Sequence, residues 1–348
     1  MKKILPINLE IYYSGMLRDR NRLVAIMSNK DMNSWYVENF IPLVMYPNGN
    51  IHCYDTTNYY EIFHIYDQVI DTKMLKQISI ESLENELKED RYVIVFCDQF
   101  YLNGSTYYHR SHKYSEILIY GFCEEEKIFY FHAGQVNRKD YDSGECDYTD
   151  FLDAVKDTYE RTNELESKTW QITFGHPLSS FKIRQVIPRM NIRQIYYHFE
   201  YLLMGRQITV QKVSDVETFI TGINIFDEME RRYSKLCIDN KNSFIHPIWC
   251  IKLLSEYILN YKNIMDALNA QLGLEFCDEI YSESSKVSDE LLSVYALLQK
   301  YMITEKETNI KKAIQLIHNV KEQFYTIVNS ICIILRNYLF DDAICINE

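Results

Sequence analysis

The chain has 348 residues, of which 47% are apolar and 25% are charged, a composition typical of folded globular proteins. This length exceeds what a single hydrophobic core usually supports, so we expect two domains, or one domain with a large appendage. The net charge of −12 argues against a nucleic-acid-binding protein, because phosphate contacts need clustered Lys and Arg.

Hydropathy and cysteine usage bear on the compartment. The segment Met1–Pro6 begins like a signal peptide, but Asn8 and Glu10 follow where an apolar region is needed. No apolar stretch approaches the ~20 residues that a membrane span requires. The nine cysteines form no CxxC pair and show no metal-ligand spacing. We therefore expect a cytoplasmic protein with reduced thiols, no membrane contact, no metal and no cofactor.

The strands of the first half come from short apolar runs. Tyr92–Cys97 and Ile117–Phe122 are nearly continuous apolar segments, which is typical of buried strands. Lys127–Phe131 follows after a short polar connection, which indicates a hairpin. Alternating patterns predict two further strands at Trp170–Phe174 and Phe181–Ile187.

Helices are expected between these strands. The first is predicted over Ile11–Met27. A second, Ile80–Lys88, has Ser79 as a possible N-cap, and a third is predicted over Tyr148–Arg161. Strands and helices together predict a mixed, α+β domain over residues 1–188.

After Pro188 the pattern becomes helical, which predicts an α-helical bundle domain over residues 189–348. Apolar residues of Asn191–Gly205 lie at helical spacing, and Gly205 is a plausible C-terminal stop. The clearest segment, residues 310–335, forms one apolar stripe over roughly seven turns. Core packing is the expected use of this stripe, and a homodimer interface is the alternative. Three further helices are predicted over 215–233, 247–272 and 288–301.

Three segments of the first half carry a resemblance to a known family: Asp98–Asn103, Tyr107–Phe122 and Ile128–Gly134. They resemble the N-terminal domain of the butirosin biosynthesis protein H family, found with bacterial peptide and polyketide pathways. Its members have a strand ending in an acidic residue, an aromatic and basic segment, and a strand of the type His-Asp-Ile-Leu-Ile-Tyr-Gly-Tyr. The resemblance implies a papain-like cysteine-peptidase-type domain with an antiparallel sheet, followed by a helical domain.

The second half extends the resemblance in part. Phe219–Asp227 is similar to the family segment Tyr-Gly-x-x-x-Tyr-Asp. Phe244–Ala267 resembles the helix in which members carry Glu-His-Lys, but this chain lacks that trio.

The family resemblance implies an acyltransferase ancestry without its catalytic residues. The prototype moves an aminoacyl chain from a carrier protein to an amine, which needs a thiolate, a general-base His and an orienting carboxylate or amide. In this chain the resemblance places these three roles at Leu9, Ser115 and Ala133, and none of these side chains can perform them. We therefore expect a catalytically degenerate relative that acts as a binding or scaffold subunit in secondary-metabolite biosynthesis.

A rebuilt active site is the alternative. Cys53 could serve as a relocated nucleophile if it met His109 or His112, which would give an acyltransferase or a thioester or amide hydrolase. Against this, Cys53 fits equally well as a buried small residue and the two histidines as surface residues. The histidine spacing matches no known zinc finger, and Asp140–Asp147 fails the calcium-loop pattern, so no metal site is predicted.

The tyrosine-rich loop Tyr101–Tyr114 is the expected ligand-binding segment. Tyrosines with basic neighbours suit a planar or anionic ligand, whether a small molecule or a peptide. The helical domain is the expected docking surface for an acyl or peptidyl carrier protein or for a catalytic paralogue. The ligand-binding candidates are Tyr101, Tyr107, Tyr108, His109, His112 and Ser115.

Overall fold

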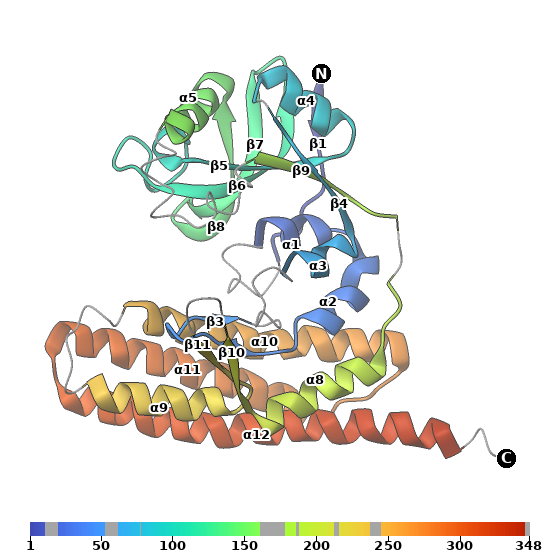
Figure 1. The fold of residues 1–348 in the computed structure, drawn as a ribbon, viewed down its shortest axis with the longest axis vertical. Coiled ribbons are helices and arrows are strands. Elements are labelled where there is room, and N and C mark those ends of the chain that lie inside the picture. The colour runs from blue at the N-terminus through green and yellow to red at the C-terminus, as the bar shows by residue number, and fades with distance from the viewer. Residues whose placement is uncertain are drawn as a thin grey trace. The chain divides into compact units, whose positions relative to one another are not determined.

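The computed structural model in Figure 1 describes residues 1–10, 20–52, 62–76, 78–160, 178–185, 188–211, 216–236 and 245–344. Contacts divide the chain into two units. Unit 1 holds the described parts of residues 1–32 and 63–187, and unit 2 holds those of 33–62 and 188–348. The sequence-based division at residue 188 assigned residues 33–52 to the first domain, whereas they pack with the second unit.

Unit 1 is built on an antiparallel sheet. Among the described residues it has seven strands in the order β4-β9-β5-β6-β7-β8, and β1 pairs with the far end of β6. The predicted hairpin is confirmed, because β6 and β7 pair across the short turn after Cys123. The strands are β1 (Lys2–Ile4), β4 (Ile70–Met74), β5 (Tyr92–Asp98), β6 (Tyr114–Cys123), β7 (Ile128–Val136), β8 (Lys139–Asp147) and β9 (Leu178–Ile183).

Strand β5 lies inside the sheet, which accounts for the continuous apolar run at Tyr92–Cys97. All seven of its residues are buried, because β9 and β6 flank it and both faces are covered. The strand predicted over Phe181–Ile187 is displaced, since β9 ends at Ile183. Trp170–Phe174 lies outside the described residues.

Helices cover the sheet of unit 1. The predicted helix Ile80–Lys88 is confirmed as α4, and the helix predicted over Tyr148–Arg161 is observed as α5 (Tyr148–Glu160). α5 packs on the sheet through Tyr148 and Phe151, whose rings lie 4.5 and 5.1 Å from that of Phe129. The remaining helical segments are α1 (Arg20–Ile26), η1 (Lys30–Met32), α3 (Ile62–Asp67) and η2 (Gln99–Tyr101). Residues 11–19 of the first predicted helix lie outside the described residues.

The start of α4 gives a first testable prediction. Ser79 accepts a hydrogen bond from the backbone N–H of Ser82, and the Ser82 hydroxyl accepts one from the Ser79 N–H, which is a capping box. Ser79→Ala is expected to lower the free energy of unfolding by about 1 kcal/mol in chemical denaturation. Ser79→Asp keeps the cap and is expected to stay close to wild type. An equal loss in both variants would contradict the capping role.

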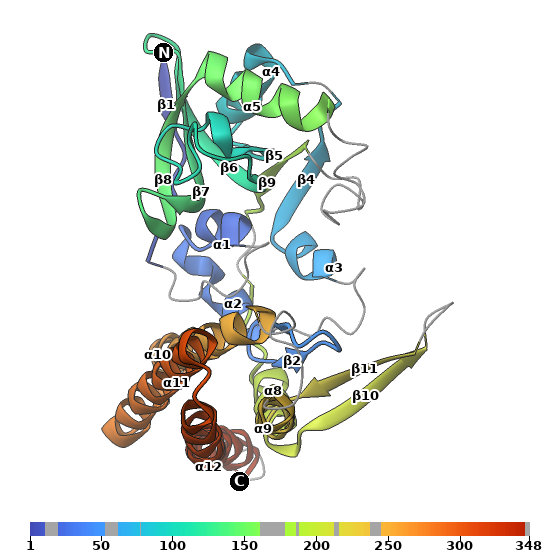
Figure 2. The ribbon, with the colours of Figure 1, turned by 90° about the vertical axis from the view of Figure 1, so that its left-hand side faces the viewer.

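The helices of unit 2 bury a continuous apolar core. Figure 2 shows the long helices α10, α11 and α12 packed together. The predicted stripe of α12, from Ile310 to Leu335, is buried against α11, α8 and α9, so it forms core within the unit. The helices of this unit are α2 (Asn33–Asn39), α8 (Ile192–Met204), α9 (Asn224–Leu236), α10 (Ile245–Leu272), α11 (Asp278–Thr304) and α12 (Glu307–Ile344).

Unit 2 also contains strands that the helical prediction missed. Its described residues form a four-stranded sheet in the order β10-β11-β2-β3. The helix predicted over residues 215–233 is wrong at its start, because 216–221 pair as β11 and α9 begins only at Asn224. The strands are β2 (Val44–Met45), β3 (Ile51–His52), β10 (Arg206–Gln211) and β11 (Val216–Thr221).

A glycine separates β11 from α9. Gly222 has a φ of +58°, and a Cβ at this position would lie 2.4 Å from the carbonyl oxygen of Leu202. Only glycine fits both the left-handed backbone and this close approach. Buried Phe219 fixes the strand by packing with Val44 and Tyr46.

None of the described helices is both long and apolar enough to cross a membrane.

Candidate functional site

The loop of residues 99–113, between β5 and β6, is organised by one buried carboxylate. Asp98 is fully buried at the end of β5. Its carboxylate accepts hydrogen bonds from the backbone N–H groups of Phe100 at 3.1 Å and Lys113 at 3.0 Å. Its second oxygen lies 2.5 Å from Nδ1 of His112. Both ends of the loop are therefore fixed to the same side chain, and the His112 ring is oriented by it.

Gln99 forms a second organising centre beside Asp98. Its buried amide donates to the Ser115 hydroxyl at 2.6 Å and to the carbonyl oxygen of Gly134 at 3.1 Å. Its own oxygen accepts from the hydroxyl of Ser105 at 2.8 Å. Ser115, at the position expected for the family's histidine, is thus part of a hydrogen-bond network that holds the loop to β6 and β7.

Aromatic rings stack along this loop. The ring of Tyr108 lies 4.0 Å from that of His109, and the Phe100 ring lies 5.4 Å from His109 and 4.6 Å from His112. The series links the oriented imidazole of His112 to Tyr108. The predicted loop is therefore an ordered, stacked segment.

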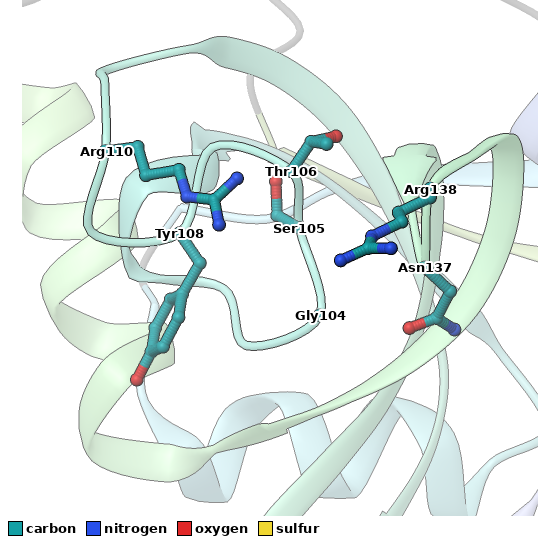
Figure 3. A pocket seen from close by; sticks show the side chains of 7 residues that line it. All are labelled: Gly104, Ser105, Thr106, Tyr108, Arg110, Asn137 and Arg138. Atoms are coloured by element: carbon teal, nitrogen blue, oxygen red, sulfur yellow. The ribbon is translucent and has the colours of Figure 1, made fainter.

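A pocket opens beside Tyr108, between this loop and the turn that joins β7 to β8 (Figure 3). Its volume is about 390 Å³. Two arginines, Arg110 and Arg138, enter it from the loop and from the turn respectively, and in Figure 3 their guanidinium groups point toward each other. The lining residues are Gly104, Ser105, Thr106, Tyr108, Arg110, Asn137 and Arg138.

Backbone geometry holds the two sides of the pocket together. Asn137 and Arg138 form a two-residue hairpin turn, with φ values of 51° and 62°, between the paired residues Val136 and Lys139. The Asn137 N–H donates to the Gly104 carbonyl oxygen at 2.8 Å. The N–H of Thr106 donates to the carbonyl oxygen of Gln135 at 2.9 Å. The turn and the loop therefore form one framework.

The electrostatics of the pocket are positive. Arg110 and Arg138 are both exposed. Within the described part of the chain, neither of them forms an ion pair with a carboxylate. Burial, reinforced by the nearby carboxylate of Asp150, raises the pKa of the Tyr108 phenol, so it is protonated at neutral pH and able to donate. The pocket thus offers two cations, and the ring of Tyr108 lines it.

The structure places the other predicted site residues as follows. Tyr101, Tyr107 and His109 lie in the same loop but do not line the pocket. Leu9 is 43% exposed, whereas Ala133 is fully buried. Cys53 lies outside the described residues.

Among the described residues, one group brings candidate metal-ligating atoms within 4.8 Å of one another: Asp98, His112 and Asp157. Sequence spacing did not indicate it, because Asp157 comes from α5. Two contacts already occupy these side chains, the Asp98–His112 hydrogen bond and one donated to Asp157 by the Tyr114 hydroxyl at 2.8 Å. The group therefore also fits an imidazole that is oriented by a buried carboxylate.

Sequence counting missed the polar side chains that face α1. Arg22 forms an ion pair with Glu116 at 3.3 Å, and Arg20 lies over the ring of Tyr141, which stacks on His132. Side chains alternate across a strand, so Glu116 and His132 point away from the face that holds Ser115 and Ala133. The sequence did contain a signal for them, because Glu116 and His132 are adjacent to the predicted positions Ser115 and Ala133.

Comparison with known proteins adds no identification: no protein-family model and no curated protein matches this chain. The structure by itself defines a mixed α and β protein with antiparallel sheets and a C-terminal helical region. Its described residues include a pocket that an ordered loop and a hairpin turn line with two arginines.

Proposed function

We propose that this protein is a non-catalytic binding protein, a degenerate relative of the carrier-protein-dependent acyltransferases that it resembles. The observation that carries the proposal is the role of Ser115, which stands where the resemblance places the catalytic histidine. Ser115 cannot act as a base, and its hydroxyl accepts a hydrogen bond from Gln99 that serves to hold the loop. Gln99 also accepts from Ser105, which lines a pocket that needs no reactive group to bind a ligand.

Several features support the finer parts of this proposal. An antiparallel sheet with α1 against β6 is compatible with a papain-like unit over the described parts of residues 1–32 and 63–187. The described cysteines, of which Cys97 and Cys146 are buried, are free thiols, as in a cytoplasmic protein. The proposed partner of the helical unit is an acyl or peptidyl carrier protein or a catalytic paralogue.

An enzyme with a rebuilt active site is the second candidate, favoured by the contact between Asp98 and His112. A buried carboxylate that holds Nδ1 orients an imidazole whose other nitrogen can exchange protons with a substrate. Cys53 is the nucleophile that this candidate requires.

The test is the intact mass of the protein after incubation with a panel of acyl-phosphopantetheine thioesters. We expect no covalent adduct and a rise in melting temperature, because binding to the folded state stabilises it. An adduct on wild type that disappears in Cys53→Ala or His112→Ala would establish the enzyme instead. If neither an adduct nor a thermal shift is observed, ligand binding is contradicted and a scaffold function remains.

A further inference from the structure

We propose that the pocket between residues 104–110 and the Asn137–Arg138 turn binds the phosphate group of a small organic phosphate between Arg110 and Arg138. The inference rests on the binding function proposed above and assigns its ligand class. Four properties of the pocket carry it: the paired cations, their opposed placement, the volume and the rigidity of the frame.

The paired arginines indicate an anionic ligand. Two guanidinium groups that point toward each other repel, and no described carboxylate neutralises either of them. The adjacent Lys139, by contrast, pairs with Asp142 at 2.9 Å. An anion between Arg110 and Arg138 would relieve their repulsion.

The opposed placement favours phosphate over carboxylate. A carboxylate has two oxygens in one plane, and the fork of a single arginine satisfies both. A phosphate monoester carries a charge of about −1.5 to −2 at neutral pH and has three acceptor oxygens in a tetrahedral arrangement. It can therefore accept from Arg110 and Arg138 on opposite sides.

The size of the pocket indicates that the phosphate belongs to an organic molecule. A volume of about 390 Å³ exceeds what a phosphate group fills and lies in the range of small-molecule sites. The side chain of Tyr108 supplies an aromatic surface on one wall, against which a ring of the ligand can pack.

The polar residues between the arginines are already used to fix the frame. The hydroxyl of Thr106 donates to the carbonyl oxygen of Gln135 at 2.6 Å, and that of Ser105 donates to Gln99. The amide of Asn137 donates to the carbonyl oxygen of Ser143 at 3.0 Å. Their roles are structural, which leaves the two arginines as the groups that recognise the ligand on a preorganised framework.

Isothermal titration of the full-length protein with phenyl phosphate tests the proposal. Arg138→Gly and Arg110→Ala are each expected to weaken binding about tenfold to hundredfold, because each removes charge-assisted hydrogen bonds. Arg138 has a φ of 62°, a conformation that glycine adopts readily, so Arg138→Gly is expected to fold at least as well as wild type. Arg193→Ala removes the same charge from an exposed position on helix α8 and is expected to bind as wild type does.

Several outcomes would overturn the inference. Unchanged affinity in both pocket variants would show that phenyl phosphate binds elsewhere. Benzoate bound as tightly as phenyl phosphate would contradict the preference for a phosphate group. If wild type does not bind phenyl phosphate, the proposed ligand class is wrong. The proposed binding function is tested separately, because a covalent adduct in the thioester experiment would contradict it.

Discussion

Asp98→Ala is expected to lower the free energy of unfolding by about 3 kcal/mol in urea denaturation, because hydrogen bonds to a charged group contribute about 1.5–3 kcal/mol each. The fully buried carboxylate accepts from the backbone N–H groups of Phe100 and Lys113 and contacts His112. Alanine leaves both N–H donors without this acceptor and both ends of the loop without their common anchor. The cost of burying the carboxylate is recovered, which limits the net loss.

Two variants separate the anchor from the imidazole contact. Asp98→Asn retains an oxygen that can accept from the two N–H groups, so its loss is expected to be nearer 1 kcal/mol. His112→Ala leaves both backbone hydrogen bonds intact and is expected to be similarly mild. Equal losses in Asp98→Ala and His112→Ala would contradict the anchoring role.

The Asp98→Ala substitution is also expected to affect ligand binding. Asp98 does not line the pocket, but Arg110 and Tyr108 belong to the loop that it anchors. Asp98→Ala is therefore expected to weaken phenyl phosphate binding in the remaining folded protein, without removing either cation.

Sequence periodicity predicted the fold best where one pattern extended over a whole element. Ile80–Lys88 had a cap and an amphipathic repeat, and the α12 stripe extended over many turns, so both were found. β11 was missed because its six residues abut a longer helix and the two were counted together. Its strand conformation depends on pairing with β10 and β2, and β2 is far away in the sequence.

The site could be predicted only where its residues are contiguous. Tyrosines and basic residues in one loop indicated a ligand-binding segment that contains Tyr108 and Arg110. Arg138 could not be found in that way, because a different hairpin brings it to the pocket. The residues that face α1 were missed for a geometric reason: a shift of one position along a strand moves the side chain to the other face, as it does from Ser115 to Glu116.

His132 makes stability depend on pH in a defined window. Its ring is fully buried. Burial, and secondarily the positive charge of Arg20, lower the pKa of His132 to about 4. An exposed histidine in the unfolded chain has a pKa of about 6.5, so the unfolded state takes up a proton that the folded state excludes. The free energy of unfolding is therefore expected to fall by about 3 kcal/mol as the pH decreases from about 6.5 to about 4.

A pair of substitutions on facing strands isolates this contribution. His132→Leu removes the titrating group, so its unfolding free energy, measured by urea denaturation at several pH values, is expected to vary less than that of wild type over this window. Ser143→Ala changes the residue opposite His132 on β8 and should keep the wild-type slope. Carboxylates with lowered pKa values, such as Glu86, act toward the acid end of the window and are common to all three proteins. The same pH slope in His132→Leu as in wild type would assign the acid sensitivity to those carboxylates, whereas a flattened slope would show that the folded protein keeps a neutral imidazole beneath α1.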